Sequence, residues 1–246
     1  MQEGTAPPLL ERVVTGLTQT IRNELAPGAR LPSEADIAGT YGVSRLTVRE
    51  AVKMLAGRGL IDSSRGRRAI VRQPDGAAFS DFFSIAARHD AKTFFDLMEV
   101  RQALEVQSAT LAARRANRAG LAAIEAALAG MIEAVEEIGT GPDRIAAESR
   151  FNRCDVGFHE ALALASGNRM LTLLLEAMAV PLAESFRMST RGRALRGQTH
   201  EATLSAHRLI VESVRKGDGR AAAQAMRAHL RDAEHDLRAA FGQGPG

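Results

Sequence analysis

The sequence predicts a mainly α-helical protein with a small N-terminal module followed by a larger all-α bundle. Its 246 residues are 45% hydrophobic but only 4% aromatic, with no Trp and with Tyr41 as the sole Tyr. This Ala- and Leu-rich composition favours closely packed helices over a sheet. Apolar residues also recur at helical spacing along most of the chain, whereas residues 60–71 change to a strand-like pattern.

The N-terminal module begins with three predicted short helices. Apolar residues share one helical face from residue 10 to residue 25, and a Pro-Gly pair then ends the pattern. Ser33 can cap a second helix, with Asp36 at the capping-box position and an end at Gly42. Ser44 is placed to cap the third helix. Three short helices in this order predict a helix-turn-helix.

The third helix combines a basic stripe with an apolar one. Arg45, Arg49 and Lys53 recur every four residues and therefore share one face, while Val48 and Leu55 lie on the adjoining face. One face can pack inside the protein, which leaves the other for phosphates and base edges. The alternative is an ordinary amphipathic helix with a solvated basic face. We interpret it as a DNA-reading helix because of its neighbours.

The strand-like stretch predicts a β-hairpin with a basic tip that includes Arg65, Arg67 and Arg68. A helix-turn-helix followed by such a hairpin is a winged helix, whose third helix enters the major groove of DNA. Residues 30–72 contain nine Arg or Lys against four Asp or Glu. Such a basic module suits salt-sensitive binding to a polyanion. An exposed basic loop without a ligand is the alternative for the tip.

The remainder predicts a linker and a helical domain. We expect a winged helix-turn-helix domain at residues 1–73, a linker at 74–91 and an all-helical domain at 92–241. Single Cys154 excludes a disulfide within the chain, and no secretion signal or membrane-spanning segment is indicated, so a cytoplasmic protein is expected. The expected helices begin near Thr93 and cover 121–138, 144–165, 169–186 with a bend at Pro181, 199–216 and 218–241.

Four residues of the helical domain could hold a metal ion. Asp155 and His159 are four residues apart and share a helical face, while His207 and His229 lie on or beside apolar faces of later helices. Imidazole and carboxylate ligands suit a divalent transition metal, Zn first, with Ni, Mn or Fe as alternatives. For any one histidine, a hydrogen-bonded core position is the commoner explanation. His200 competes with His207 for this site; His207 is preferred because of its apolar flanks, and the role of His200 stays open.

These segments together resemble the GntR family of bacterial transcription regulators, in its FadR-like branch with an FCD-type ligand-binding domain. The stretches that carry the resemblance are ARLPSEADIAGTYGVSRLTVREAVKMLAGRGLI (29–61), MEVRQALE (98–105), DVGFHEALALASGN (155–168), HRLIVESVRKGDGRAAAQAM (207–226) and AHL (228–230). The resemblance implies a homodimer on a palindromic double-stranded operator. It departs from the family's pattern at Ala35 and Arg68, where an Arg and a wing Gly are usual.

The resemblance also assigns roles to single residues. Arg101 stands one turn before Glu105, so it can pair with that carboxylate or point into the bundle toward an anion. In the family's pattern the matching arginine holds a small organic-acid effector. The family's pattern further implies DNA contacts by Arg45, Thr47, Arg49 and the wing residue Gly66, and metal ligation by Asp155, His159, His207 and His229.

The sequence thus predicts a DNA-binding transcription regulator, expected to repress, whose operator binding responds to a carboxylate effector at a metal site. We do not expect an enzyme. A metal-dependent hydrolase or lyase in the helical domain is one alternative, although no convincing additional general base or nucleophile is found near the predicted ligands. A regulator with a purely structural metal is the other.

Overall fold

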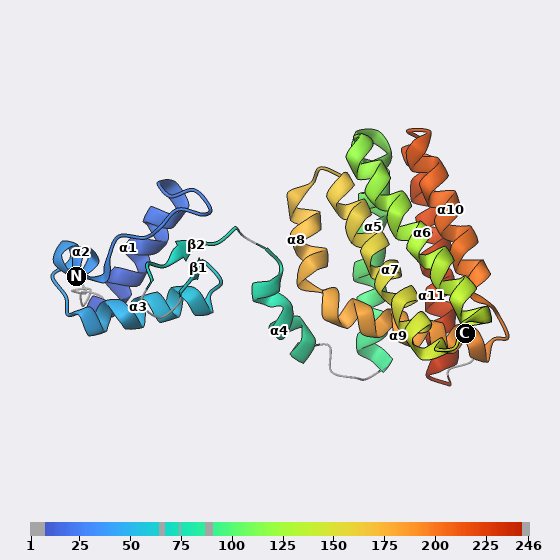
Figure 1. Cartoon of the computed structure of the whole chain (residues 1–246), viewed down its shortest axis with the longest axis horizontal. Helices are drawn as coiled ribbons and strands as arrows, with labels where there is room; N and C mark the ends of the chain where they lie inside the picture. The colour runs from blue at the N-terminus through green and yellow to red at the C-terminus, as the bar shows by residue number, and fades with distance from the viewer. Residues whose placement is uncertain (1–7, 64–66, 74, 87–90, 243–246) are drawn as a thin grey trace, which may run out of the picture. The chain divides into compact units, whose positions relative to one another are not determined.

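A computed structural model describes residues 8–63, 67–73, 75–86 and 91–242 of the chain. The chain divides into two compact units, Met1–Ala78 and Phe79–Gly246 (Figure 1). The first unit contains three helices and a two-stranded sheet, and the described part of the second contains only helices. The predicted fold class, mainly α with an N-terminal winged helix-turn-helix, is therefore confirmed.

The first unit consists of α1 (Leu9–Asn23), α2 (Glu34–Tyr41), α3 (Arg45–Gly57), β1 (Ile61–Asp62) and β2 (Ile70–Val71). The Ser33 side chain accepts from the Asp36 backbone N–H, and the Asp36 carboxylate accepts from that of Ser33, which completes the capping box of α2. Gly42 ends this helix in the left-handed region at φ 64°. Ser44 caps α3 by accepting from the Thr47 N–H.

The core of the first unit is entirely apolar. One apolar stripe of each of the three helices faces inward. Leu31, in the turn before α2, adds to this core. Its buried members are Val13, Val14, Leu17, Leu31, Ile37, Val48, Ala51, Leu55, Ile61 and Ala69. This core fixes the orientation of α3, because the apolar face of α3 is buried in it.

The wing is a short antiparallel hairpin. Ile61 pairs with Val71 and Asp62 with Ile70. Arg30 forms a bridge with Ile70, so the chain before α2 pairs with the outer side of β2. The tip residues 64–66, which include the predicted DNA contacts Arg65 and Gly66, lie outside the described residues.

The second unit is a helical bundle with one helix in the segment expected as a linker. That helix is α4 (Ala77–Ala86), which the sequence pattern had not indicated. The bundle proper is built from α5 (Ala91–Arg115), α6 (Arg118–Thr140), α7 (Arg144–Ala165), α8 (Arg169–Ala177), α9 (Ala179–Leu195), α10 (His200–Arg215) and α11 (Gly219–Ala240).

One helix prediction is wrong in detail. A single helix bent at Pro181 was expected over 169–186, but the chain breaks at Met178 between α8 and α9. Pro181 lies in the first turn of α9, where a missing N–H costs little because the first amides have no partner within the helix. Pro181 therefore begins a helix and does not bend one.

The bundle core joins α5, α6, α7, α10 and α11, which run alongside one another in Figure 1. Helix α9 packs closely on α11, since a Cβ at Gly192 would lie only 1.7 Å from the Asp236 carbonyl oxygen. Only glycine allows this approach of the two backbones. No helix in the described part of the chain is both long and apolar enough to cross a membrane.

Candidate functional site

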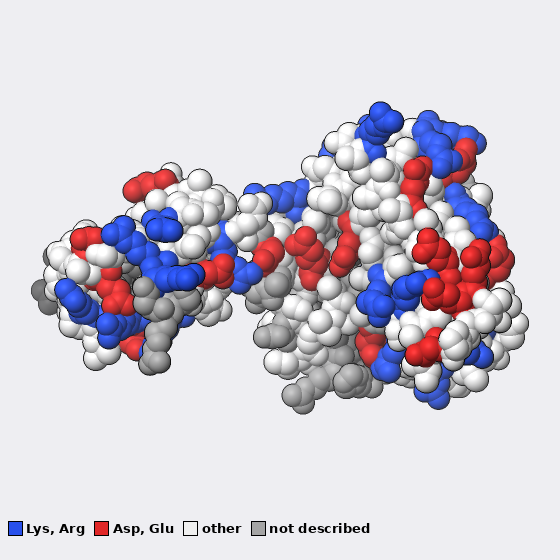
Figure 2. All heavy atoms as spheres, viewed as in Figure 1, with Lys and Arg blue, Asp and Glu red and all other residues white. Residues whose placement is uncertain are grey.

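Helix α3 presents a basic surface opposite its buried face. Arg45, Arg49 and Lys53 are exposed, and Leu46 next to them has 68% of its surface accessible. Figure 2 shows Lys and Arg side chains, drawn in blue, gathered on the first unit. Arg45, Arg49 and Lys53 therefore share one accessible side of the helix, whereas Thr47, two residues from each arginine, faces another side and is only partly exposed.

The basic side chains of α3 are held only by exposed pairs. Arg49 Nε lies 2.9 Å from Glu34 Oε2 of α2, and both side chains are largely exposed. Lys53 pairs in the same way with Glu50. Exposed ion pairs contribute about 0 to 1 kcal/mol to stability, so a phosphate can replace the carboxylate at little cost. Thr47 Oγ1 lies 2.9 Å from Ser44 Oγ at the start of the helix.

A groove of about 690 Å³ runs between α3, the start of α2 and the wing. Its cationic lining comes from Arg49 and Lys53 of α3 and from Arg67 and Arg68 beside the wing tip, with Glu34 as the acidic member. The groove thus brings together the two basic segments that were separate in the sequence. Concave basic surfaces of this kind focus positive potential on a polyanion.

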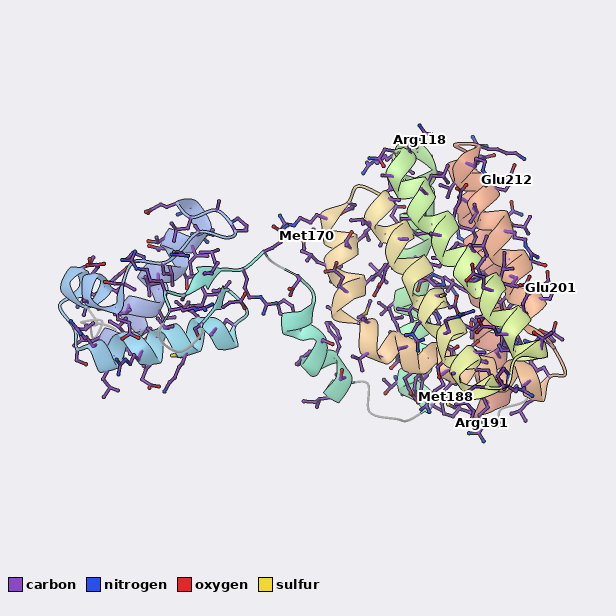
Figure 3. The ribbon with its side chains drawn as sticks, viewed as in Figure 1. Arg118, Met170, Met188, Arg191, Glu201 and Glu212 are labelled. Carbon is purple, nitrogen blue, oxygen red and sulfur yellow. The ribbon has the colours of Figure 1, made fainter. Side chains whose placement is uncertain are left out.

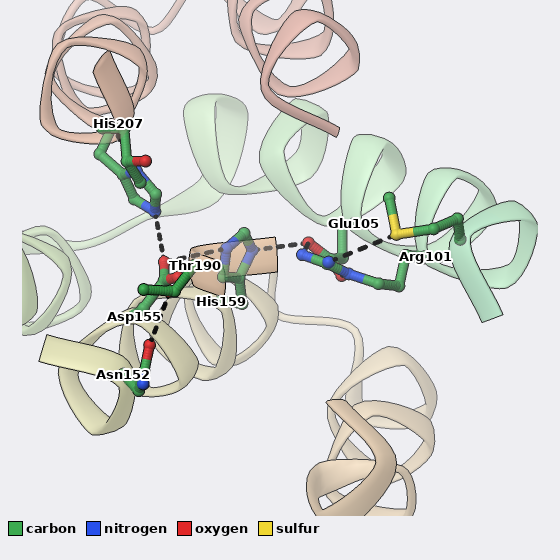
Figure 4. Close-up of polar contacts among 9 residues, drawn as sticks. Arg101, Glu105, Asn152, Asp155, His159, Thr190 and His207 are labelled. Carbon is green, nitrogen blue, oxygen red and sulfur yellow. Dashed lines mark hydrogen bonds and ion pairs between the residues drawn. The ribbon is translucent and has the colours of Figure 1, made fainter. Parts of the chain in front are cut away.

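Three histidines of the second unit converge inside the bundle. His159 of α7, His207 of α10 and His229 of α11 are buried, and one ligand atom of each lies within 4.8 Å of the others. Asp155 of α7 joins them, because its Oδ1 lies 2.9 Å from His207 Nε2 and 3.6 Å from His159 Nε2 (Figure 4). All four predicted ligands therefore meet in one place.

The donor atoms of this cluster are left without hydrogen bonds. Nε2 of His159, His207 and His229 and Oδ1 of Asp155 are all buried, and none has a hydrogen-bond partner among the residues that the structure describes. The contacts of Asp155 Oδ1 with Nε2 of His207 and His159 are ion pairs, and His229 Nε2 has no such partner among the described residues. Four buried donor atoms that have only one another as partners form a site that a bound ion can satisfy better. Three imidazoles and one carboxylate fit a divalent transition metal.

Two further groups orient the imidazoles. His207 Nδ1 lies 2.9 Å from the Thr203 carbonyl oxygen, so Nδ1 donates and Nε2 keeps its lone pair. His159 Nδ1 lies 2.6 Å from Glu105 Oε2, which orients that ring in the same sense. The sequence had singled out Glu105 only as a neighbour of Arg101. Its contact with His159 spans two helices, and no local pattern could indicate it.

The electrostatics of the cluster favour ligation. Burial opposes the charged form of Asp155, but His159 and His207 hold the pKa of its carboxyl well below the usual range. Burial, together with His207 and His159, holds the pKa of His229 well below the usual value, so this ring stays neutral. Although burial opposes it, Glu105 raises the pKa of His159 to about 9, so this ring carries a proton at neutral pH that a metal must displace.

Arg101 is fully buried and pairs with Glu105. Its Nε lies 2.6 Å from Glu105 Oε1, and its guanidinium stands over the Phe186 ring at 4.3 Å. Nη1 contacts only the weak acceptor Met98 Sδ, at 3.6 Å. The sequence left two interpretations of Arg101, an ion pair with Glu105 or a contact with an anion inside the bundle. The structure shows the ion pair with Glu105. The guanidinium is nevertheless separated from His159 by a single carboxylate.

His200 lies outside the cluster. Its ring packs edge-on against Phe151, with centroids 4.6 Å apart, and it is only partly buried. The apolar flanks that favoured His207 over His200 therefore selected the ring that meets the other histidines.

Two family models match the chain. Residues 9–71 match the bacterial regulatory proteins of the gntR family, and residues 96–232 match the FCD domain. These ranges coincide with the helix-turn-helix and wing of the first unit and with the bundle that holds the histidine cluster.

Relatives of this chain are transcription regulators. The HTH-type transcriptional regulator LutR of Bacillus subtilis is 33% identical over 89% of this chain and 95% of its own length. The galactonate operon transcriptional repressor of Escherichia coli is 30% identical over 87% and 89%, and the Glc operon transcriptional activator is 28% identical over 94% and 89%. A GntR structure from Streptococcus agalactiae matches with a TM-score of 0.68 and 26% identity over 90% and 97%. The chain is therefore a transcription regulator of the GntR family with a C-terminal FCD domain.

Proposed function

We propose that this regulator represses transcription as a homodimer on operator DNA and that a small organic acid, bound beside a metal ion in the FCD domain, changes its affinity for the operator. The four buried atoms without hydrogen bonds, from Asp155, His159, His207 and His229, are the observation that carries the proposal. An ion would give all four atoms a common partner, which the protein alone does not supply to His229 Nε2 within the described residues.

The operator would be read by α3 and the wing. Arg45, Thr47 and Arg49 lie at or near the start of α3, the part of a recognition helix that enters the major groove. Arg65 and Gly66 complete the proposed contacts from the wing tip. Two copies of α3 in a dimer would bind two half-sites, as the symmetry of a palindromic operator requires.

The metal would be held by the four converging side chains, with Glu105 and the Thr203 carbonyl orienting two of them. Zn is proposed first, with Ni, Mn or Fe as alternatives, because imidazole and carboxylate ligands suit all of them. When bound, such an ion supplies open coordination positions that a carboxylate oxygen can take. The residues of the chain supply orientation, a buried environment and charge balance.

Arg101 is proposed to hold the effector's carboxylate. Its guanidinium has five donors in a planar fork, and Glu105 accepts from only two of its nitrogens. The name of the galactonate operon repressor supports an organic acid as the ligand class, since galactonate is a carboxylate. That relative also supports repression, while the slightly less similar Glc operon relative is an activator.

The test is a melting-temperature screen of the full chain against small carboxylates. We expect a hit that raises the melting temperature of the metal-loaded protein, because a ligand that binds the native state stabilises it. Chelation should abolish the shift. Arg101→Lys should lower the affinity for the carboxylate about tenfold or more, since Lys keeps the charge beside Glu105 but loses the bidentate fork.

The hit must then change operator affinity, by about 5- to 150-fold for a typical coupling. A ligand that binds at the metal without changing operator affinity would contradict the regulatory part of the proposal. Strong loss of stability on chelation with no hit in the screen would instead indicate a structural metal.

A further inference from the structure

We propose a second anion site in the FCD domain, away from the histidine cluster, that binds an oxyanion such as a phosphate or a carboxylate. It is a cavity of about 310 Å³ between α7, α9 and the start of α10. The lining residues used below are Arg144 of α7, Arg187, Arg191 and Arg193 of α9, and His200 at the start of α10. Figure 3 shows Arg191 at the end of the bundle opposite Arg118.

The central residue of this cavity is Arg193, which has only 7% of its surface exposed. Its Nε lies 3.2 Å from Asp236 Oδ2, but its Nη1 is buried without a hydrogen-bond partner. The contact of Gly192 with the backbone of α11 fixes the main chain beside it. A buried guanidinium nitrogen without an acceptor points to an anion.

A second unpartnered donor lies in the same cavity. His200 Nε2 is buried and has no hydrogen-bond partner, although the ring itself is only partly buried. This residue also begins α10, a helix of 16 residues whose N-cap Thr199 gives no side-chain hydrogen bond. The positive end of the α10 dipole therefore reinforces the arginines without competition from a capping oxygen.

The charges around the cavity leave a positive excess. Arg187 pairs with Glu184, and Arg144 pairs with Glu148. Asp236 is shared by Arg193 and Arg196, with Arg196 Nη1 at 2.6 Å from Oδ1. Five arginines, Arg191 included, thus meet three carboxylates. One small dianion would balance the set.

The site is separate from the proposed metal centre but lies on the same side of α10. His200 and His207 are seven residues apart, which is about 10 Å along a helix. Arg193 also lines a smaller pocket that includes His229, so the cavity and the proposed metal centre adjoin at this arginine, and a long acid with two charged ends can occupy both. The oxyanion is therefore either a free anion or the far end of a long effector.

The experiment titrates the full chain with inorganic phosphate by calorimetry at constant ionic strength, with the metal-loaded and the chelated protein. We expect saturable binding of similar affinity in both. The variant Arg144→Gln/Arg191→Gln should weaken it about tenfold, because both side chains are at the mouth and largely exposed, so folding is preserved. Arg193→Gln should abolish binding, but it also removes a partner of Asp236.

The matched control is Arg208→Gln/Arg215→Gln, which removes the same charge from exposed positions of α10 outside the cavity. Phosphate affinity in this control should stay within twofold of the wild type. An equal loss in both double variants would show diffuse electrostatics and overturn the site, as would absence of saturable binding. Loss of phosphate binding on chelation alone would place the anion at the metal and also overturn it.

Adipate, a linear six-carbon dicarboxylate, identifies the source of the oxyanion. Affinity for adipate that depends on both the metal and the two arginines would support the site as the far end of a long effector. Adipate binding that depends on the arginines alone would support it as a site for a free anion.

Discussion

The two units of this regulator place their charges in opposite ways. In the described part of the first unit, the buried side chains are all apolar, and the basic residues of α3 lie at the surface. All 13 buried polar or charged residues of the described chain belong to the second unit, among them Arg101, Asp155 and Asp236. The first unit thus has its charges in solvent, whereas the second has part of its charges in the interior of the bundle.

This difference has an energetic meaning. A solvated arginine contributes little to folding and is free to exchange an exposed carboxylate for a phosphate. A buried charge is costly unless it is paired, and its removal leaves the partner uncompensated. Substitutions at the DNA surface should therefore separate binding from stability. Substitutions inside the FCD domain should change ligand binding and stability together.

The largest effect is expected for Glu105→Gln in the FCD domain. It leaves the fully buried Arg101 without its counter-ion, which costs about 3 to 5 kcal/mol of unfolding free energy. The substitution also removes the carboxylate beside His159, so metal affinity should fall about 10- to 100-fold. Calorimetric melting of the chelated protein measures the first effect, and competition with a metal indicator measures the second.

Glu201→Gln is the control for this prediction, because Glu201 pairs with Arg208 at the surface of the same unit. It should cost less than about 1 kcal/mol. Equal destabilisation by the two substitutions would mean that burial of an ion pair does not change its contribution to the unfolding free energy.

A somewhat smaller effect is expected in the core of the first unit. Leu55→Ala removes a fully buried side chain of α3 and should cost about 2 to 5 kcal/mol, through the lost burial and the cavity left behind. Operator binding should be lost as the first unit unfolds, while metal binding by the FCD domain persists. Hydrogen exchange resolved by peptide would show increased exchange in residues 9–71 only. Faster exchange around His207 would contradict independent cores.

The same contrast explains how far the sequence could predict each unit. In the first unit, local signals were sufficient: Ser33, Asp36 and Ser44 mark the helix starts, and the structure contains each of these caps. In the second unit, residues 144–165 were predicted as a helix with the bounds that the structure has. The break at Met178 was missed because the apolar pattern continues through it.

The interior contacts of the bundle were harder to predict. The spacing of Asp155 and His159 places both on one face, but only tertiary packing brings in His207 and His229 from other helices. The contact of Glu105 with His159 and that of Arg193 with Asp236 join residues 54 and 43 positions apart. Such contacts have no period that a single sequence could display. The resemblance to the GntR family grouped the four predicted ligands, but it did not indicate the contacts of Glu105 and Arg193.

The smallest effect on stability is expected from Arg49→Ala. This substitution tests whether an exposed charge of the first unit contributes to DNA binding and not to folding. The substitution removes an exposed ion pair with Glu34, so the melting temperature should stay almost unchanged. Operator affinity should fall by about 1 to 3 kcal/mol, or roughly 5- to 150-fold, if Arg49 contacts a base edge. Fluorescence anisotropy with labelled operator at fixed salt measures this loss.

The control Arg12→Ala removes the same charge from an exposed position of α1 outside the groove. A loss of affinity that is equal in the two variants would mean that only the net charge of the unit matters. If Arg49 contacts a phosphate and not a base, the loss should be the same for operator and unrelated DNA, and the salt dependence should decrease by about one charge. A loss confined to the operator would identify Arg49 as a residue that reads the operator sequence. With an unchanged melting temperature, it would also show that Arg49 serves DNA binding and not the folding of the first unit.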